Sequence, residues 1–362
     1  MRRHWQRKPL LVRGAFSGFR DPLSAREVLA LAGSRDAASR LVQRRGAKWT
    51  VEHGPFAAAR FKQLPRRAWT LLVQDANHFS TRADELLAHF DFVPHARIDD
   101  VMVSYAVPGG GVGPHVDSYD VFLLQGSGRR RWQVSRQTDH AFVAGLDLKI
   151  LERFEPAEEW VLEAGDMLYL PPGVAHNGIA ESECLTWSIG FRAPADRELM
   201  AGFLDFLHER TDPRGRYSDP GAAPARHPAE VPMAMVDHAA RALSASLRWN
   251  DADVRRFMGR HLSQPRQEAW FAPPVRPLSR AAFAKRAASA GVALDPRSRL
   301  LFSGTMFYLN GEAERVPRGV VALVRALADK RKLAAPLRAP REFWETVHAW
   351  YLQGFVHAGE KA

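Results

Sequence analysis

Three side chains that commonly bind metals occur in two short stretches of the chain. His115 and Asp117 lie in PGGGVGPHVD, and His176 lies in EAGDMLYLPPGVAHNG. Residues two apart on an extended strand project from the same face, so His115 and Asp117 are expected to point into one cavity. Two imidazoles and one carboxylate form a facial triad, which leaves adjacent positions open on an Fe(II) ion. The sequence therefore predicts a catalytic metal site built from His115, Asp117 and His176.

An arginine-rich strand is predicted close to these ligands, in QGSGRRRW at residues 125–132. Because side chains alternate between the two faces of a strand, Arg130 shares one face with Trp132, and its two arginine neighbours share the other. A guanidinium group binds a carboxylate through two parallel N–H donors. Arg130 is therefore expected to hold the distal carboxylate of 2-oxoglutarate, whose 2-oxo acid end would chelate Fe(II). The alternative is a solvated basic hairpin.

Composition favours a globular protein of two or three domains. The chain has 362 residues and a single cysteine, Cys184, which excludes an intrachain disulfide and a multi-cysteine metal site. No apolar run approaches the roughly 20 residues of a membrane-spanning helix, and no secretory signal is visible, so we expect a cytoplasmic protein without a membrane partner. The net charge of +11 indicates either a nucleic-acid contact, such as ribosomal RNA, or a solvated basic surface.

The order of predicted elements indicates an α+β protein. A flank opens with a helix started by a capping box at Ser24 and Glu27. Between residues 98 and 192, short β runs separated by turns predict a sandwich or barrel. These runs are Val101–Val107, Val121–Gln125, Arg131–Val134, Trp160–Leu162, Met167–Leu170 and Thr186–Phe191.

Helical patterns dominate after residue 196. An extended connection is predicted over residues 212–232, and two helices over 233–261 with Asn250 or Asp251 capping the second. Beyond a Pro-rich linker, we expect a small α+β unit with a hairpin, formed by residues 300–302 and 306–309, that turns near Asn310-Gly311.

These motifs resemble one known family. Residues 98–192 are similar to the JmjC branch of the cupin-fold 2-oxoglutarate oxygenases, and one subgroup, the bacterial ribosomal oxygenases, is similar along nearly the whole chain. The stretches that carry the resemblance are HGPF at residues 53–56, SYAVPGGGVGPHVD at 104–117, YDVF at 119–122, QGSGRRRW at 125–132 and GFRAP at 190–194.

The resemblance implies a double-stranded β-helix core of the cupin or jelly-roll type. The family's iron ligands fall on His115, Asp117 and His176, and its 2-oxoglutarate anchor falls on Arg130. It further implies a helical dimerisation segment, hence a homodimer, and a winged-helix-like C-terminal domain. We accordingly expect an oxygenase domain with its flank at residues 1–205, a dimerisation segment at 206–270 and the winged-helix-like domain at 271–362.

The activity implied by the resemblance is hydroxylation of an arginine at its β-carbon on large-subunit ribosomal protein L-sixteen, with Fe(II), 2-oxoglutarate and dioxygen. An arginine substrate needs an acidic or hydrogen-bonding contact near the metal, for which Asp120 and Ser118 are the expected residues. The basic chain and the basic substrate are compatible if the mouth of the pocket is locally acidic.

Other functions remain open at this point. A JmjC-type demethylase or a hydroxylase of another protein would use the same metal site. A cupin isomerase with zinc or manganese would also use it. A nucleic-acid-binding module with an inactive cupin fold would explain the basic charge, although its triad would be expected to be damaged.

Overall fold

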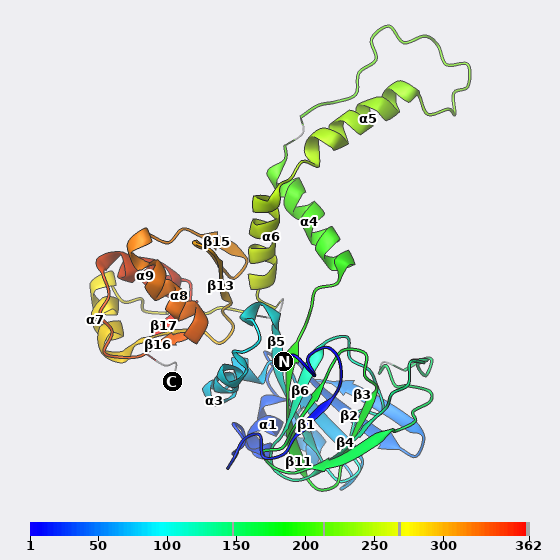
Figure 1. Ribbon diagram of the computed structural model, residues 1–362, viewed down its shortest axis with the longest axis vertical. Coiled ribbons are helices and arrows are strands. Elements are labelled where there is room, and N and C mark those ends of the chain that lie inside the picture. The colour runs from blue at the N-terminus through cyan, green and yellow to red at the C-terminus, as the bar shows by residue number, and fades with distance from the viewer. Residues whose placement is uncertain (147, 213, 267–268, 360–362) are drawn as a thin grey trace.

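A computed structural model of the chain describes residues 1–146, 148–212, 214–266 and 269–359. Figure 1 shows a β-rich body formed by the first half of the chain, a helical arm that projects from it, and a C-terminal unit of helices and short strands beside the arm. Among the described residues, none of the helices combines the length and apolar character that a membrane span requires.

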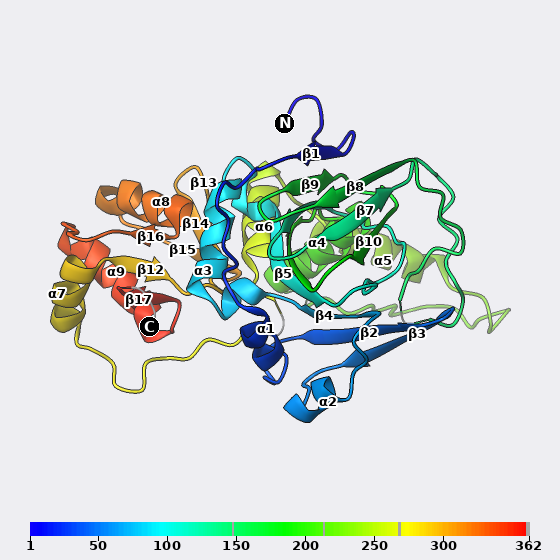
Figure 2. The same ribbon diagram turned by 90° about the horizontal axis from the view of Figure 1, so that it is seen from below.

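The body is built on an eight-stranded antiparallel sheet with the order β1-β9-β6-β11-β5-β4-β2-β3. Its strands are β1 Leu10–Val12, β2 Ser39–Arg45, β3 Lys48–His53, β4 Trp69–Val73, β5 Ile98–Ala106, β6 Asp120–Gln125, β9 Met167–Leu170 and β11 Cys184–Phe191. A three-stranded sheet of order β10-β7-β8 contains β7 Arg130–Val134, β8 Glu158–Leu162 and β10 His176–Ala180. Figure 2 shows this second sheet lying across from β4 and β2, in the arrangement of a double-stranded β-helix.

The sheet is buried on both faces at its centre. On β6, Val121 and Leu123 face the space between the two sheets, while Phe122 and Leu124 belong to the core on the other side. Helices cover that outer side: α1 Ala25–Leu31, α2 Ala58–Lys62 and α3 Thr81–Asp84, with 3₁₀ turns at Ala76–His78, Glu85–Phe90 and His95–Arg97. Ser24 and Glu27 form the predicted capping box of α1. Cys184 is buried and unbonded, as expected from the single cysteine.

The arm consists of α4 Asp196–Arg210, α5 Met233–Ser246 and α6 Asp251–Ser263. Of the two residues predicted as caps, Asn250 and Asp251, Asn250 caps α6 by accepting hydrogen bonds from two backbone N–H groups of its first turn. The helices α4 and α6 pack through a small aromatic cluster of Phe203, Phe206 and Phe257. By contrast, α5 buries no residue.

The C-terminal unit has its own core, formed between helices and two three-stranded sheets. Its elements are α7 Arg280–Ala290, β12 Val292–Leu294, β13 Leu300–Ser303, β14 Met306–Leu309, β15 Glu312–Glu314, a 3₁₀ turn at Arg318–Val320, α8 Val321–Lys330, β16 Lys332–Leu333, α9 Arg341–Leu352 and β17 Val356–Ala358. The predicted hairpin is present as β13 and β14, but it turns at residues 304–305. Asn310 and Gly311, both with positive φ, turn β14 into β15 instead.

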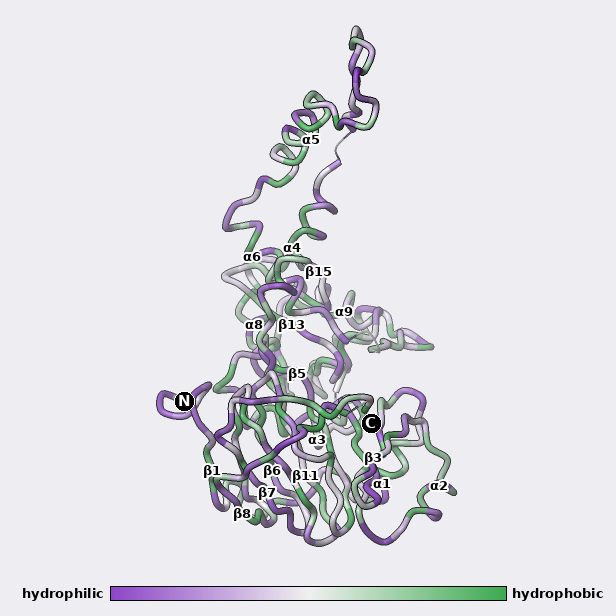
Figure 3. Tube along the Cα trace, turned by 90° about the vertical axis from the view of Figure 1, so that its right-hand side faces the viewer, coloured by the Kyte–Doolittle hydropathy of each residue, from purple (hydrophilic) through white to green (hydrophobic). Residues whose placement is uncertain are grey.

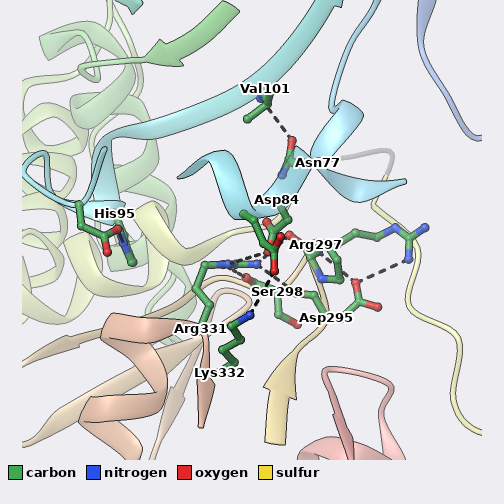
Figure 4. A network of polar contacts seen from close by, with 12 residues as sticks. Asn77, Asp84, His95, Val101, Asp295, Arg297, Ser298, Arg331 and Lys332 are labelled. Carbon is green, nitrogen blue, oxygen red and sulfur yellow. Dashed lines mark hydrogen bonds and ion pairs between the residues drawn. The ribbon is translucent and has the colours of Figure 1, made fainter. Parts of the chain in front are cut away.

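A polar junction joins the C-terminal unit to the body (Figure 4). Arg331 follows α8 with a positive φ of 58°, and its guanidinium donates to the backbone carbonyls of Ser298 and Pro296 at 3.1 and 3.0 Å. The same group forms an ion pair with Asp84 of α3 at 3.4 Å. Burial raises the pKa of the Asp84 carboxyl, and Arg331 opposes that rise. Arg331 therefore compensates a buried carboxylate across the junction.

Replacing Arg331 by alanine is expected to destabilise the junction by about 2 kcal/mol, because the mostly buried carboxylate of Asp84 would lose its arginine partner. The partial exposure of Asp84 to water limits the loss to this size. Thermal unfolding should show a lower midpoint or a separate early transition of the C-terminal unit. The exposed Arg338, replaced by alanine, is the matched control. Equal unfolding curves for both variants would contradict this role of Arg331.

Candidate metal centre and active-site pocket

A pocket of about 490 Å³ lies between the two sheets of the body. Inward-facing residues of β5, β6, β7 and β11 line it, together with the loops that carry the predicted ligands. His115, Asp117, His176 and Arg130 all belong to this lining. A larger cavity of about 620 Å³, between the body, α6 and the C-terminal unit, contains none of these four residues.

The two histidines are brought together by the backbone. His115 and His176 form an isolated antiparallel bridge in which each backbone N–H donates to the carbonyl of the other, at 3.0 and 2.9 Å. His176 begins β10, a strand that the sequence pattern had not indicated. His115 and Asp117 lie in a loop and not on the extended strand that was expected, so this bridge sets their position instead of strand alternation.

The three predicted ligands converge on one point. One potential ligand atom from each of His115, Asp117 and His176 lies within 4.8 Å of the others. The Asp117 carboxylate lies 4.0 Å from Nε2 of His115 and 3.7 Å from Nε2 of His176. Distances of this size leave space for a metal ion between the donor atoms.

Both imidazoles are oriented through their other nitrogen. Nδ1 of His115 lies 2.9 Å from the carbonyl of Gly113, and Nδ1 of His176 lies 2.9 Å from the carbonyl of Val174. A hydrogen bond from Nδ1–H to a carbonyl leaves Nε2 as the free lone pair that binds a metal. Burial lowers the pKa of His176 to about 4, with His115 adding to the effect, so this imidazole is neutral at neutral pH.

Arg130 faces the same pocket, as strand alternation predicted. Arg130 is 5% exposed, and its Nη1 donates a hydrogen bond to the hydroxyl of Ser104 at 3.3 Å. Among the described residues, Nε and Nη2 of Arg130 are buried without a hydrogen-bond partner. A buried guanidinium with unused donors is costly unless an anion pairs with it. Arg130 is therefore placed and equipped to bind a carboxylate inside the pocket.

The residues present fit an Fe(II) ion and 2-oxoglutarate. Two imidazoles and a carboxylate suit Fe(II) and leave coordination positions free for a bidentate ligand. The unpaired fork of Arg130 suits the distal carboxylate of that ligand. The apolar side chains of Val121, Leu123 and Trp132 line the same pocket.

The two residues expected to contact a substrate lie elsewhere. Asp120 is fully buried, and its carboxylate accepts hydrogen bonds from Gln6, Arg97 and Tyr169 at 3.0, 2.9 and 2.6 Å. Because its neighbour Val121 faces the pocket, alternation turns Asp120 to the opposite side of β6. The expectation that the Asp120 carboxylate contacts a substrate in this pocket is therefore wrong. Ser118 is exposed in a bend and is not among the lining residues.

An acidic end of the pocket was missed in the sequence. Asp100 and Met102 line the pocket together with Ser104, since they occupy alternating positions of β5, and Asp99 lies beside them. Burial raises the pKa of Asp100 to about 7, against the opposing effect of Arg266. The signal was available, because Asp99 and Asp100 directly precede the predicted strand Val101–Val107 and two adjacent carboxylates are unusual at the start of a buried strand.

Removal of a triad side chain is expected to abolish tight metal binding. Asp117→Ala or His176→Ala should lower the affinity for Fe(II) or Mn(II) at least about 100-fold. Mutating a residue that only orients a metal ligand already lowers metal affinity up to about 100-fold, and removing the ligand itself should cost more. Anaerobic isothermal titration calorimetry measures this affinity, with His227→Ala at an exposed position as the control. Retained affinity in both triad variants would place the metal elsewhere.

Comparisons with known proteins agree with this geometry. Residues 85–199 match the model of the JmjC domain, and residues 246–357 match that of the ROXA-like winged helix. The chain is 41% identical over 278 residues to the ribosomal protein uL16 3-hydroxylase of Escherichia coli, which covers 76% of this chain and 74% of the relative. It is 37% identical over 217 residues to a probable ribosomal oxygenase of Haemophilus influenzae, covering 59% and 54% of the two chains.

Solved structures extend the likeness to the whole fold. The X-ray structure of E. coli ycfD superposes with a TM-score of 0.84 and 36% identity, covering 98% of this chain and 96% of the other. A structure of the same ribosomal oxygenase in complex with cobalt and 2-oxoglutarate matches with a TM-score of 0.81 and the same coverage. The chain described here therefore belongs to the family of bacterial JmjC-type ribosomal oxygenases.

Proposed function

We propose that this protein is an Fe(II)- and 2-oxoglutarate-dependent oxygenase that hydroxylates the β-carbon of an arginine in large-subunit ribosomal protein uL16. The observation that carries the proposal is the convergence of His115, Asp117 and His176 beside the unpaired guanidinium of Arg130, in one buried pocket. The similar E. coli protein is named a uL16 3-hydroxylase, and the E. coli structures include complexes of cobalt with 2-oxoglutarate and with succinic acid.

In this proposal each pocket residue has one task. His115, Asp117 and His176 hold Fe(II), and Arg130 binds the distal carboxylate of 2-oxoglutarate. When bound, iron and 2-oxoglutarate supply the oxidising power that places one oxygen atom of dioxygen on a carbon of the substrate, with succinate and carbon dioxide as co-products. Ser104 holds Arg130 through its hydroxyl, and Trp132 packs beside the guanidinium with its ring centroid 5.7 Å away.

The acidic end of the pocket supports an arginine as the substrate residue. Asp100 and Ser104 are four positions apart on β5, which separates their Cα atoms by roughly 13 Å along the strand. Ser104 marks the 2-oxoglutarate end through its bond to Arg130, so Asp100 marks the opposite end. A substrate arginine with its β-carbon at the metal can extend its guanidinium towards Asp100. The contact first assigned to Asp120 thus passes to Asp100, and Ser118 at the exposed loop remains a proposed contact for the substrate chain.

A homodimer is part of the proposal. Apolar side chains stand exposed on α4, on α5 and after it: Met200, Leu204, Met233, Met235, Val236, Leu243, Leu247 and Trp249. Figure 3 shows apolar positions recurring along the projecting α5, which is far from the cores of the body and the C-terminal unit. An exposed apolar face of this kind is typical of a protein interface, and a second copy of the arm offers the same face for self-association.

The division of the chain follows from these assignments. We propose an oxygenase domain at residues 1–205, a dimerisation segment at 206–270 and a winged-helix-like domain at 271–362; the winged-helix match itself extends back to residue 246 and so includes α6. We also propose a cytoplasmic location, which a ribosomal protein as substrate supports. Contact of the basic surface with ribosomal RNA remains a proposal that the net charge of +11 supports.

Incubation of uL16 with the protein, Fe(II), 2-oxoglutarate and dioxygen is expected to add about 16 Da, the mass of one oxygen atom, to one arginine. Intact-mass and fragment-ion spectrometry would locate the addition. The His115→Ala variant should give no addition, because the metal is lost. Consumption of 2-oxoglutarate by the wild-type protein without any mass gain would retain an oxygenase but reject this substrate.

Arg130→Met is expected to raise the KM for 2-oxoglutarate about 10- to 100-fold, because a charge-assisted pair of hydrogen bonds to the distal carboxylate is lost. The neighbour Arg129 directly precedes β7, is 56% exposed and pairs with Glu181, so Arg129→Met is the matched control. Steady-state consumption of 2-oxoglutarate measures both. An unchanged KM in Arg130→Met would show that another group binds the co-substrate.

A further inference from the structure

A cluster of three carboxylates and one arginine closes the acidic end of the pocket. Arg266 donates from Nη2 to the carboxylate of Asp99 at 2.9 Å, and its Nε lies 3.2 Å from the carboxylate of Asp75. The distance from Arg266 to Asp100 is longer, at 3.8 Å. The exposed fractions of the four side chains lie between 12% and 25%, so their charges interact with little screening. The four charges therefore interact strongly, and the guanidinium of Arg266 lies closer to Asp99 and Asp75 than to Asp100.

Arg266 reaches this cluster from outside the oxygenase fold. It follows α6 of the arm, which ends at Ser263, whereas Asp75 and Asp99 belong to the body. A second guanidinium also comes from the C-terminal half, because Nη2 of Arg299 donates to the backbone carbonyl of Asp99 at 3.0 Å. The part of the chain beyond the cupin core thus supplies positive charge to the acidic end of the active-site pocket.

Asp100 keeps acceptor capacity on the side of the pocket. Its carboxylate accepts a hydrogen bond from the backbone N–H of Asp75, while Arg266 stays beyond hydrogen-bond distance. Gly190 of β11 leaves room around it, since a Cβ at that position would lie 3.3 Å from the Asp100 carboxylate. An incoming guanidinium can therefore pair with Asp100 without displacing Arg266 from Asp99.

We propose that Arg266 is a positioning residue for substrate recognition: by binding Asp99 and Asp75 it leaves Asp100 as the carboxylate that receives the guanidinium of the substrate arginine. This inference rests on the proposed function. Three neighbouring carboxylates repel one another, and one fixed cation between them lowers the cost of holding all three in their charged form. The arm therefore contributes to the substrate pocket as well as to assembly.

The charge on Asp100 sets the expected pH dependence. The groups that face it are Asp75, Asp99, Arg266 and Tyr119, with Arg299 next to Asp99. The pKa of Asp100 is raised to about 7 by burial, and Arg266 is the group that lowers it most. A carboxylate binds a guanidinium only in its ionised form, so affinity for an arginine peptide should increase as the pH rises through about 7. Loss of Arg266 raises the pKa of Asp100 further and moves this increase to higher pH.

The test compares Arg266→Gln, Arg266→Lys and the exposed control Arg276→Gln in the full-length protein. An arginine-containing uL16 peptide is titrated between pH 6.5 and 9 under anaerobic conditions, with Mn(II) and 2-oxoglutarate bound, and KM and kcat are then measured aerobically. At pH 7, Arg266→Gln should bind the peptide about five- to tenfold more weakly, the effect of roughly one unit in the pKa of Asp100. The difference should shrink towards pH 9, and Arg266→Lys should restore most of the affinity.

Three readouts separate this role from a general structural one. Peptide-independent consumption of 2-oxoglutarate should stay close to wild type in Arg266→Gln below its unfolding transition, while the KM for the peptide rises and kcat changes little. The same pH profile in Arg266→Gln as in wild type would overturn the proposal, and so would tighter peptide binding, which would mean that Arg266 competes with the substrate. A wild-type protein that binds and hydroxylates no arginine peptide would instead reject the proposed function, and this inference with it.

Discussion

The reciprocal backbone bridge between His115 and His176 is the contact on which the site depends. The two residues are far apart in the chain, one in the Gly-rich loop before β6 and the other at the start of β10. Their paired N–H and carbonyl groups fix the loop against the second sheet, and the backbone carbonyls two residues before each histidine direct the imidazoles. Asp117 is held within the same arrangement, because its carbonyl accepts a hydrogen bond from Gly173. A metal centre of this kind needs both sheets of the double-stranded β-helix.

Electrostatics divides the pocket into two ends. A buried cation, Arg130, occupies one end, and Asp99 and Asp100 occupy the other, although the chain as a whole carries a net charge of +11. Burial strengthens both ends, since charges interact more strongly where water is excluded. The pocket is thus suited to an anionic co-substrate beside the metal and a cationic substrate side chain beyond it. Its local charge, and not the net charge of the protein, bears on what it binds.

Much of this was accessible from the sequence, for physical reasons that differ between residues. The inward orientation of Arg130 follows from strand alternation alone, and the convergence of His115, Asp117 and His176 follows from the donor chemistry together with the family resemblance. The capping box at Ser24 is a local pattern and is confirmed, and Asn250 is the one of the two proposed caps, Asn250 and Asp251, that caps α6. Asp120 was misassigned because nearness in sequence to the ligands was taken for nearness to the pocket, whereas alternation on β6 turns it away.

Other features depend on long-range contacts that no local pattern encodes. The contact between Arg266 and Asp99 joins residues 167 positions apart, and the partner of Asp84 lies 247 positions away. The turn at Asn310-Gly311 was correctly predicted, but it was assigned to the hairpin of β13 and β14 and in fact connects β14 to β15. Turn residues indicate that the chain reverses, but not which of three consecutive short strands pair. Pairing order and tertiary contacts decide such cases.

The most direct test of the account is an anaerobic optical titration of the protein with Fe(II) and 2-oxoglutarate. Chelation of a 2-oxo acid by Fe(II) gives a visible charge-transfer absorption, which neither component shows alone. We expect this absorption in the wild-type protein at a single equivalent of iron and its absence in Asp117→Ala. In Arg130→Met, a much higher concentration of 2-oxoglutarate should be needed to saturate the absorption. No absorption in the wild-type protein, or equal saturation in Arg130→Met, would contradict the assignment of this pocket as an iron and 2-oxoglutarate site.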